Sequence, residues 1–281
     1  MRQKDREGDV MSFVLRPLPG HLWSGQLDSF PAERLIHGFS TRQGGVSAPP
    51  WDALNMALHV GDDPAAVREN RTRYLRALGL SLDNVCTLRQ VHGTEIVRAL
   101  PSDAGRGAFD NTDALADADA LITNARGVTL LLCYADCVPV MIYDPKHHAA
   151  GLIHAGWKGT VERIAAKTLE RMTSVFGTDP FDVLAGIGPS IGAACYEVHG
   201  DVAERFSMAF PGHEDMLLRE IDGRTHLDLW AANCVQLAEA GVPAAQVDCA
   251  ETCTACEHTT FYSYRAAGGR TGRMAAVMEL I

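Results

Sequence analysis

Cysteine and histidine side chains occur at the ends of two neighbouring apolar segments in the middle of the chain. Residues 128–160 read VTLLLCYADCVPVMIYDPKHHAAGLIHAGWKGT; Cys137 precedes one apolar run and His154 ends the next. A turn at Asp144-Pro145 makes these runs a hairpin, so Cys137 and His154 are expected at the same end of adjacent strands. His92 lies in a QVHG segment before another strand-like run. Titratable groups at strand ends beside a core are typical of functional sites.

These three residues fit three kinds of chemistry. One thiolate and two imidazoles can bind Zn²⁺ and leave the fourth position open to water or substrate, as in catalytic zinc sites. The same residues also suit a cysteine nucleophile with a histidine base and an accessory histidine. A buried thiol beside two hydrogen-bonded core histidines is the third interpretation. The residue types alone leave all three open.

Four further side chains are candidates for roles around this centre. Asp136 precedes the cysteine and is a candidate for proton transfer or for holding a zinc-bound histidine, or else a turn-capping aspartate. Arg42 in a TRQGG loop, Lys158 after His154, and Arg265 in FYSYR are candidates for binding phosphate. Arg42 also fits a structural turn with a surface arginine, Arg265 is equally a candidate for contacting ribose, and Trp157 suits either a stacked purine or the core.

The remaining cysteines favour no disulfide framework. Eight cysteines in 281 residues are too dilute for one. Cys253 and Cys256 form a CxxC with Cys249 just upstream, but no second CxxC completes a four-thiolate zinc site. Most of these thiols are expected to be small buried hydrophobic groups.

The apolar pattern predicts a mixture of helices and strands. Helices are expected at 65–78, 160–176, 201–210 and 228–240. Strands are expected at 95–100, 120–123, 128–134, 139–144, 149–154, 182–187 and 273–280. The crossover helices are too few for a fully parallel sheet. We therefore expect an α+β fold with mixed sheets and outer helices, in one domain from residue 12 to 281.

Composition excludes several classes of protein. Apolar residues are 47% and charged residues 21%, which suits a globular chain with a sizeable core. The net charge of −10 argues against a nucleic-acid surface. No apolar run approaches the roughly 18 residues of a membrane span, and the charged start lacks a signal peptide's apolar stretch. We expect a cytoplasmic protein with a disordered leader at residues 1–11; nothing in the sequence specifies an oligomeric state.

A series of motifs, in order from about residue 36 to 280, resembles the bacterial laccase-domain or polyphenol oxidase family. They are HGFSTRQGGVS (37–47), NMALHVGDD (55–63), ENR (69–71), QVHG (90–93), DADA (117–120), ADCVPV (135–140), HAGWKG (154–159), GPSIG (188–192), YEV (196–198), CT (253–254), FYSYR (261–265) and TGRMAAV (271–277). Any one of these is weak, but their number and order make chance similarity very improbable.

The resemblance implies a zinc site at His92, Cys137 and His154 and a four-layer α/β/β/α architecture. It implies a purine nucleoside phosphorylase that acts on adenosine, inosine and S-methyl-5'-thioadenosine and also deaminates adenosine. Its partners would then be purine nucleosides and phosphate. Other members are described as peptidoglycan-editing factors, which keeps an amidase or cysteine hydrolase as an alternative, and older usage describes copper-dependent polyphenol oxidases.

The polyphenol oxidase alternative can be tested against the sequence. Multicopper oxidases need many histidine ligands, commonly in His-x-His pairs, whereas this chain has 11 histidines and no such pair. His147 and His148 are adjacent and would point to opposite faces of a strand. Copper at a Cys/His₂ site would be adventitious, because copper binds N/S ligands more tightly than zinc does.

Overall fold

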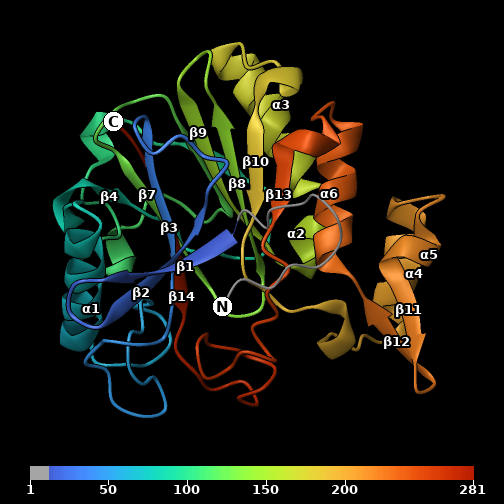
Figure 1. The fold of residues 1–281 in the computed structure, drawn as a ribbon, viewed down its shortest axis with the longest axis horizontal. Coiled ribbons are helices and arrows are strands. Elements are labelled where there is room, and N and C mark those ends of the chain that lie inside the picture. The colour runs from blue at the N-terminus through green and yellow to red at the C-terminus, as the bar shows by residue number, and fades with distance from the viewer. Residues whose placement is uncertain (1–12) are drawn as a thin grey trace.

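Two six-stranded β-sheets stack face to face in the computed structural model of the protein, which describes residues 13–281 (Figure 1). The leader expected at 1–11 lies outside the described residues. The first sheet contains, in spatial order, β1 (Phe13–Leu18), β2 (Leu22–Leu27), β3 (Leu35–Ser40), β14 (Met274–Leu280), β7 (Thr129–Tyr134) and β4 (Val85–Cys86). Its pairs are antiparallel except β4 with β7.

The second sheet is also mixed. It contains β13 (Val247–Cys249), β10 (Leu184–Ile187), β8 (Val138–Asp144), β9 (Ala149–Ala155), β6 (Ala120–Thr123) and β5 (Ile96–Arg98), with parallel pairs at both edges. A separate hairpin of β11 (Leu218–Ile221) and β12 (Arg224–Leu227) lies beside α4 (Gly200–Ala209) and α5 (Glu214–Leu217) at one end of the molecule (Figure 1).

Alternate residues of the strands fill the space between the sheets. Because successive side chains of a strand point to opposite faces, Leu130 and Leu132 of β7 face Met141 of β8 and Leu152 of β9 in one buried cluster. Leu131 of β7 points the other way, to the outer face of the first sheet. His154 shares the inner face with Leu152, so it lies where the inter-sheet core ends.

Helices cover both outer faces. On the first sheet, Tyr74 and Leu75 of α1 (Pro64–Ala77) pack against Leu131 and Val277. On the second, α3 (Ile164–Phe176) and α6 (Leu229–Glu239) cover residues such as Ile153. The order helix, sheet, sheet, helix confirms the predicted mixed α+β fold in a single domain.

The predicted helices are present, but one is interrupted. Residues 160–176 were expected as one helix, which is wrong: α2 (Trp157–Val161) stops before Arg163, whose backbone is left-handed, and α3 starts after it. Gln236 of α6 satisfies the interrupted backbone: its Nε2 donates to the Thr160 carbonyl at 3.1 Å and its Oε1 accepts from the Ala165 N–H at 3.2 Å. Because Gln236 is distant in sequence, no local pattern near Arg163 predicts the break in the helix.

All seven predicted strands exist, β6 with the predicted bounds and the other six with shifted ends, and other strands were missed. The missed strands are β1, β2, β3, β4, β11, β12 and β13. β4, β11, β12 and β13 have only two to four residues, and β1 is an edge strand with exposed residues. β2 and β3 are six-residue strands inside the first sheet that the apolar pattern did not reveal. Short 3₁₀ turns complete the described chain: Leu82–Asn84, Pro101–Asp103, Asn111–Asp113, Pro180–Asp182, Ala193–Cys195 and Ala244–Gln246. Within residues 13–281, no helix has both the length and the apolarity to cross a bilayer.

Candidate active site

The hairpin of β8 and β9 positions Cys137 and His154. Val138 pairs with Ala155 and Pro139 with His154. Cys137 therefore lies directly before the first residue of β8, beside the end of β9 that contains His154. This confirms the expected placement at the same end of neighbouring strands. Asp136, with φ of 82°, turns the chain from β7 in the first sheet into β8 in the second. Cys137 therefore lies at the crossing between the sheets.

The loop that carries His92 is tied to β7 and to Asp119. Gln90 behaves like a strand neighbour of Cys133: its Nε2 donates to the Cys133 carbonyl and its Oε1 accepts the Cys133 N–H, both at 2.8 Å. The Asp119 carboxylate accepts the backbone N–H groups of Val91, His92 and Gly93 at 3.2, 3.0 and 2.6 Å. These bonds hold His92, whose φ is 60°, in a left-handed conformation.

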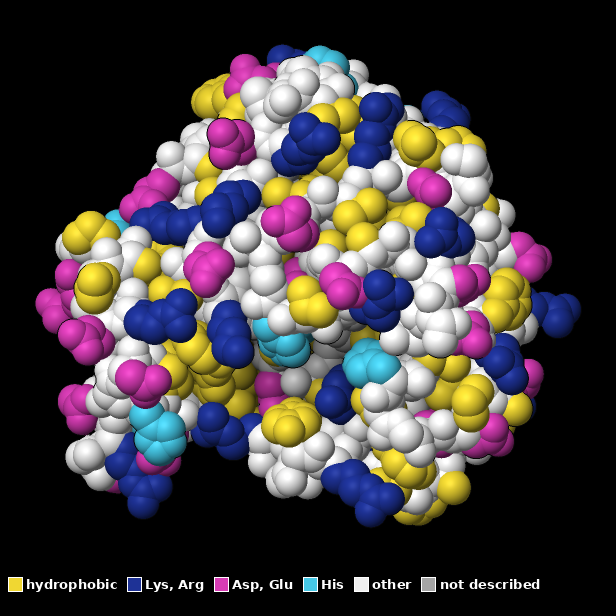
Figure 2. Space-filling view, turned by 180° about the vertical axis from the view of Figure 1, so that it is seen from behind, with side chains coloured by type: hydrophobic (Ala, Val, Ile, Leu, Met, Phe, Trp, Pro, Cys, Tyr) yellow, Lys and Arg dark blue, Asp and Glu magenta, His cyan; other side chains and the backbone are white. Residues whose placement is uncertain are grey.

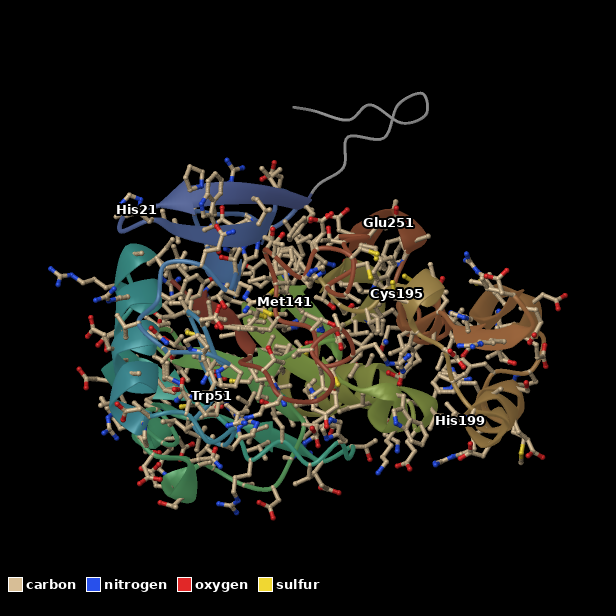
Figure 3. The ribbon with its side chains drawn as sticks, turned by 90° about the horizontal axis from the view of Figure 1, so that it is seen from below. His21, Trp51, Met141, Cys195, His199 and Glu251 are labelled. Atoms are coloured by element: carbon tan, nitrogen blue, oxygen red, sulfur yellow. The ribbon has the colours of Figure 1, made fainter. Side chains whose placement is uncertain are left out.

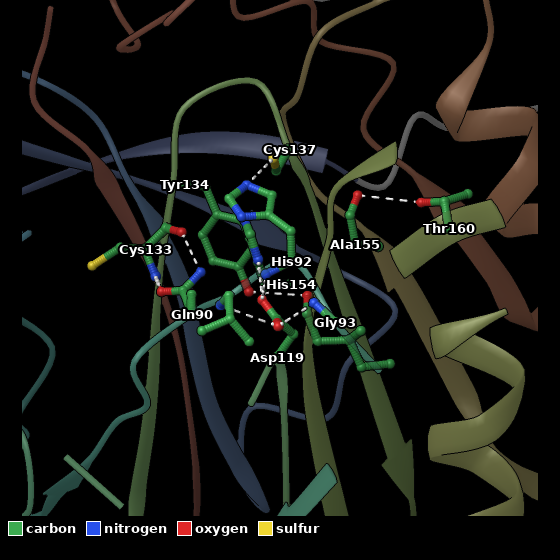
Figure 4. A network of polar contacts seen from close by, with 12 residues as sticks. Gln90, His92, Gly93, Asp119, Cys133, Tyr134, Cys137, His154, Ala155 and Thr160 are labelled. Carbon is green, nitrogen blue, oxygen red and sulfur yellow. Dashed lines mark hydrogen bonds and ion pairs between the residues drawn. The ribbon is translucent and has the colours of Figure 1, made fainter. Parts of the chain in front are cut away.

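Asp119 also fixes the orientation of His154 (Figure 4). Its Oδ1 lies 2.7 Å from His154 Nδ1, and its carbonyl accepts the His154 N–H at 2.7 Å. With Nδ1 held by a carboxylate, the other ring nitrogen, Nε2, is left to face the cluster, the usual arrangement of a metal-binding histidine. Holding a zinc-bound histidine was one of the alternatives that the sequence left open for Asp136; in the structure Asp119 makes this contact with His154.

His92, Cys137 and His154 converge as the sequence predicted. One ligand atom from each lies within 4.8 Å of the others, and Cys137 Sγ is 3.7 Å from His92 Nε2. The two imidazole rings meet edge to face with centroids 4.8 Å apart. Tetrahedral zinc with ordinary bond lengths separates a sulfur and a nitrogen ligand by about 3.6 Å. His154 is buried, whereas His92 is exposed, so the cluster opens to solvent on one side.

Opposite charges stabilise each other at this cluster. Burial disfavours the Cys137 thiolate, but the charges and hydrogen bonds of His154 and His92 outweigh it and lower the pKa of Cys137 to about 6. Burial likewise disfavours the His154 imidazolium, yet Cys137 and Asp119 raise the pKa of His154 to about 9. Cys137 is therefore anionic at neutral pH, which is the form that binds metal or attacks as a nucleophile.

Gly156 leaves room for the side chains of His92 and Cys137. A Cβ at this position would lie 2.9 Å from His92 Cδ2 and 3.1 Å from Cys137 Sγ. Gly156 has an ordinary φ of −69° at the start of α2. Glycine is thus needed here for space beside the two side chains rather than for an unusual backbone.

The Asp136 carboxylate is used elsewhere. It accepts from Thr254 Oγ1 at 2.6 Å and from the Arg265 N–H at 2.7 Å. These contacts join the turn before Cys137 to two segments from the C-terminal part of the chain. Both partners are distant in sequence, so the carboxylate ties other segments to this turn rather than capping the turn itself. The role of Asp136 in proton transfer stays a prediction.

Two of the three predicted phosphate-binding cations contact protein carbonyls. All three guanidinium nitrogens of Arg42 donate to protein oxygens, among them the carbonyls of Asp52 and His258. Arg265 is exposed and donates through Nη1 and Nη2 to the carbonyls of Cys195 and Glu197. Lys158 is exposed beside Trp157, with Nζ 5.8 Å from the ring centroid. Their phosphate-binding roles stay predictions.

Arg273 and His59 lie near the cluster, although the sequence assigned neither a catalytic role. Burial lowers the pKa of Arg273, and the neighbouring Cys133 and Cys137 act in the opposite direction. His59 is exposed to solvent on one side. Desolvation by the atoms packed around its imidazole is the main cause that lowers the pKa of His59 to about 4, and the positive charge of Arg273 is the second cause. Both lie in motifs already noted, TGRMAAV and NMALHVGDD, but only the fold reveals their proximity. In Figure 2, histidine and basic side chains border a hollow near the middle of one face.

Comparison with known proteins places this architecture in a family. Residues 36–281 match the family described as "Multi-copper polyphenol oxidoreductase laccase". The chain belongs to this family. The resemblance seen in the motifs is thereby confirmed.

Relatives of this chain carry two kinds of enzyme name. The chain is 40% identical to "Purine nucleoside phosphorylase YlmD" of Geobacillus stearothermophilus, over 88% of this chain and 90% of that protein. It is 35% identical to "Adenosine deaminase RL5" of an unknown prokaryotic organism, over 88% and 95%. The crystal structure of Bacillus licheniformis hypothetical protein YfiH superposes with a TM-score of 0.89 at 35% identity, covering 95% of this chain and 99% of that one.

Proposed function

We propose that this protein is a zinc-dependent purine nucleoside phosphorylase that also deaminates adenosine. Its substrates would be adenosine, inosine and S-methyl-5'-thioadenosine together with phosphate. The observation that carries the proposal is the convergence of His92, Cys137 and His154 with one side open to solvent. The names of the relatives point to purine nucleosides as the substrate class.

The donor set fits zinc. Zn²⁺ binds a thiolate and imidazole nitrogens, and three protein ligands leave one position for water or substrate. The 3.7 Å between Cys137 Sγ and His92 Nε2 is close to the tetrahedral spacing. The Asp119 contact with His154 Nδ1 supplies the outer hydrogen bond that such ligands use. When bound, zinc would act as a Lewis acid and lower the pKa of water toward about 7.

The chain's own residues would bind and orient the reactants. In phosphorolysis a phosphate oxygen bonds to the sugar C1′, the bond from C1′ to the purine nitrogen breaks, and the base takes up a proton. Positive charge must therefore hold phosphate close to the sugar. Arg273 is half-buried near Cys137, and its contacts to Thr271 and Gly272 use Nη1 only. We propose Arg273 for this role beside Arg42, Arg265 and Lys158; the contacts of Arg42 with Asp52 and His258 would also fix the neighbouring loop.

A cysteine hydrolase is the second candidate, favoured by one specific observation. The Cys137 thiolate beside a protonated His154 resembles the ion pair of cysteine nucleophiles. An amidase acting on a peptidoglycan precursor would fit either chemistry. Turnover of nucleosides would support the phosphorylase. Turnover of a peptidoglycan precursor without turnover of nucleosides would support the amidase.

The site does not fit a multicopper oxidase. In residues 13–281, two groups of three metal-ligating side chains occur, and neither contains more than two histidines. A trinuclear copper cluster with a separate blue-copper site needs more histidine ligands than these groups supply. Copper found in the His92, Cys137 and His154 site would be adventitious under this proposal.

The deciding experiment incubates the purified protein with inosine, adenosine or S-methyl-5'-thioadenosine, with and without phosphate. The proposal expects free base and sugar 1-phosphate only when phosphate is present, and ammonia from adenosine in either case. Removing metal with a chelator should stop both reactions, and zinc should restore them. Base release that survives chelation would favour the cysteine mechanism, and no turnover of any nucleoside would refute the proposal.

A further inference from the structure

Three thiols outside the candidate active site lie close together. Cys195 ends the 3₁₀ turn that follows the GPSIG segment, and Cys253 and Cys256 form the CxxC after β13. Their sulfur atoms all lie within 4.8 Å of one another, with Cys195 Sγ 3.4 Å from Cys256 Sγ. Sulfur atoms are drawn near Cys195 and Glu251 in Figure 3. We call these residues the three-thiol cluster.

The fold rather than the sequence spacing selects the third thiol. The nearest upstream cysteine, Cys249, lies in β13 and is not part of the cluster. Ser190 forms a parallel bridge with Cys253, which places the segment leading to Cys195 alongside the CxxC. The Gly192 N–H donates to Cys253 Sγ at 3.2 Å, a contact that favours the thiolate over the thiol.

The arrangement has the features of a metal site. Thiolates of a tetrahedral zinc site lie about 3.8 Å apart, given ordinary zinc–sulfur bonds. Cys256 is exposed and gives access from solvent. A surface cavity of about 460 Å³ is lined by Cys253 and Cys256 and by the carboxylate-bearing residues Glu251 and Glu257. The cavity supplies both an entry path and negative charge that attracts cations.

We propose that Cys195, Cys253 and Cys256 bind a soft d¹⁰ metal ion, Zn²⁺ or Cu⁺. Thiolate ligands select these ions over hard cations such as Mg²⁺ or Ca²⁺. Each thiol loses its proton as it binds, so the bound ion replaces protons on three sulfurs. This site is separate from His92, Cys137 and His154, and it stands whether or not the proposed function is correct.

The ion would join two segments that bear on the candidate active site. Thr254, inside the CxxC, donates to Asp136 in the turn before Cys137. The carbonyl of Cys195 accepts from Arg265 Nη1 at 3.3 Å. An ion held by the three thiols would therefore fix the positions of both contacts. We expect the bound metal to raise the thermal unfolding temperature.

The test isolates the three-thiol cluster by disabling the other site. Full-length Cys137→Ala protein is reduced, stripped of metal and kept anaerobic, then loaded with Zn²⁺ or Cu⁺ in separate arms and desalted. Elemental analysis should find about one ion per chain in at least one arm, accompanied by ultraviolet thiolate-to-metal absorbance. Adding Cys256→Ser should remove that ion, whereas adding Cys249→Ser, the matched control, should retain it.

Each arm has an outcome that overturns the proposal. The arm in which the protein retains metal identifies the ion. If the protein retains neither Zn²⁺ nor Cu⁺, the proposed site is refuted. Full retention in the Cys256→Ser protein also refutes it. If neither ion binds but peroxide produces a Cys195–Cys256 disulfide by mass spectrometry, the cluster is a redox pair instead. Cys195→Ser repeats the test from the other segment, and near-ultraviolet circular dichroism verifies that each variant is folded.

Discussion

Asp119 is the residue that organises the candidate active site. One carboxylate accepts three backbone N–H groups of the His92 loop and contacts His154 Nδ1, so it positions two of the three proposed zinc ligands together. His154 and Asp119 are 35 residues apart in sequence. The sequence could indicate His92, Cys137 and His154 from their types and motifs, but the partner of His154 depends on which strands pair.

Replacing Asp119 with asparagine should weaken zinc binding. The amide would present N–H groups to a loop that already donates three, and it removes the charge beside His154. Loss of such an outer partner lowers metal affinity by roughly 10–100-fold. Competition with a chromophoric chelator measures this. Asp117→Asn, two residues away and exposed beside Arg89, is the control and should bind zinc normally; equal affinity in both variants would contradict this role for Asp119.

His37 should make the fold sensitive to acid. Burial lowers its pKa to about 4, although the charge of Asp28 opposes the shift, and its Nε2 accepts the Leu27 N–H at 2.9 Å. The unfolded state binds a proton near pH 6.5 and the folded state does not, so stability falls as pH drops from about 6.5 to 4. Between pH 7 and 5 this histidine should cost about 2 kcal/mol.

His37→Gln retains an acceptor for the Leu27 N–H and cannot be protonated. In urea unfolding, its free energy of unfolding should fall by about 2 kcal/mol less than that of the wild type between pH 7 and 5. Parallel pH profiles of the two proteins would show that His37 is not the acid-sensitive group.

Two features around the site differ in how far the sequence predicted them: the β8–β9 hairpin and the break between α2 and α3. The β8–β9 hairpin was evident from its apolar runs and its Asp144-Pro145 turn. The break between α2 and α3 was not, because Gln236 from another helix satisfies the freed backbone groups. Local pattern thus identifies a hairpin whose partners adjoin in sequence and misses an interruption that depends on a distant side chain.

Gly156, between β9 and α2, gives an element-scale test. Gly156→Ala would place a methyl group within 3.1 Å of both His92 Cδ2 and Cys137 Sγ, while its φ suits alanine. We expect weaker zinc binding and lower activity with an almost unchanged free energy of unfolding. Gly200→Ala, at the start of α4 with nothing within 4 Å of the new methyl group, is the control. Normal zinc affinity in Gly156→Ala would show that the ligands can shift to accommodate it.

At the scale of the whole molecule, the core between the two sheets holds the site in place. Sequence patterning indicated covered sheet faces, because strands such as β7, β8 and β9 are largely apolar, and it indicated mixed sheets, because the crossover helices are too few for a parallel sheet. It missed β1, whose residues are mostly half-buried or exposed. Which strands share a sheet is set by long-range pairing, so a connection as short as the one from β7 to β8 can still change sheets.

Leu152 tests the contribution of this core. It is fully buried between the sheets, two residues before His154 on the same face of β9. Leu152→Ala should lower the free energy of unfolding by about 2–5 kcal/mol through lost burial and the cavity left behind. Denaturant unfolding measures the loss, with the exposed Leu15→Ala as the control. A loss below about 1 kcal/mol would mean that this layer repacks freely.

We propose that the centre formed by His92, Cys137 and His154 performs the nucleoside chemistry. The most direct measurement compares phosphate-dependent base release from inosine, and ammonia release from adenosine, in Cys137→Ala and in Cys249→Ala, whose thiol lies outside both metal-ligand groups. We expect the Cys137→Ala protein to lose both activities while remaining folded, and the Cys249→Ala protein to retain both. Full activity of the Cys137→Ala protein in either reaction would contradict the proposal.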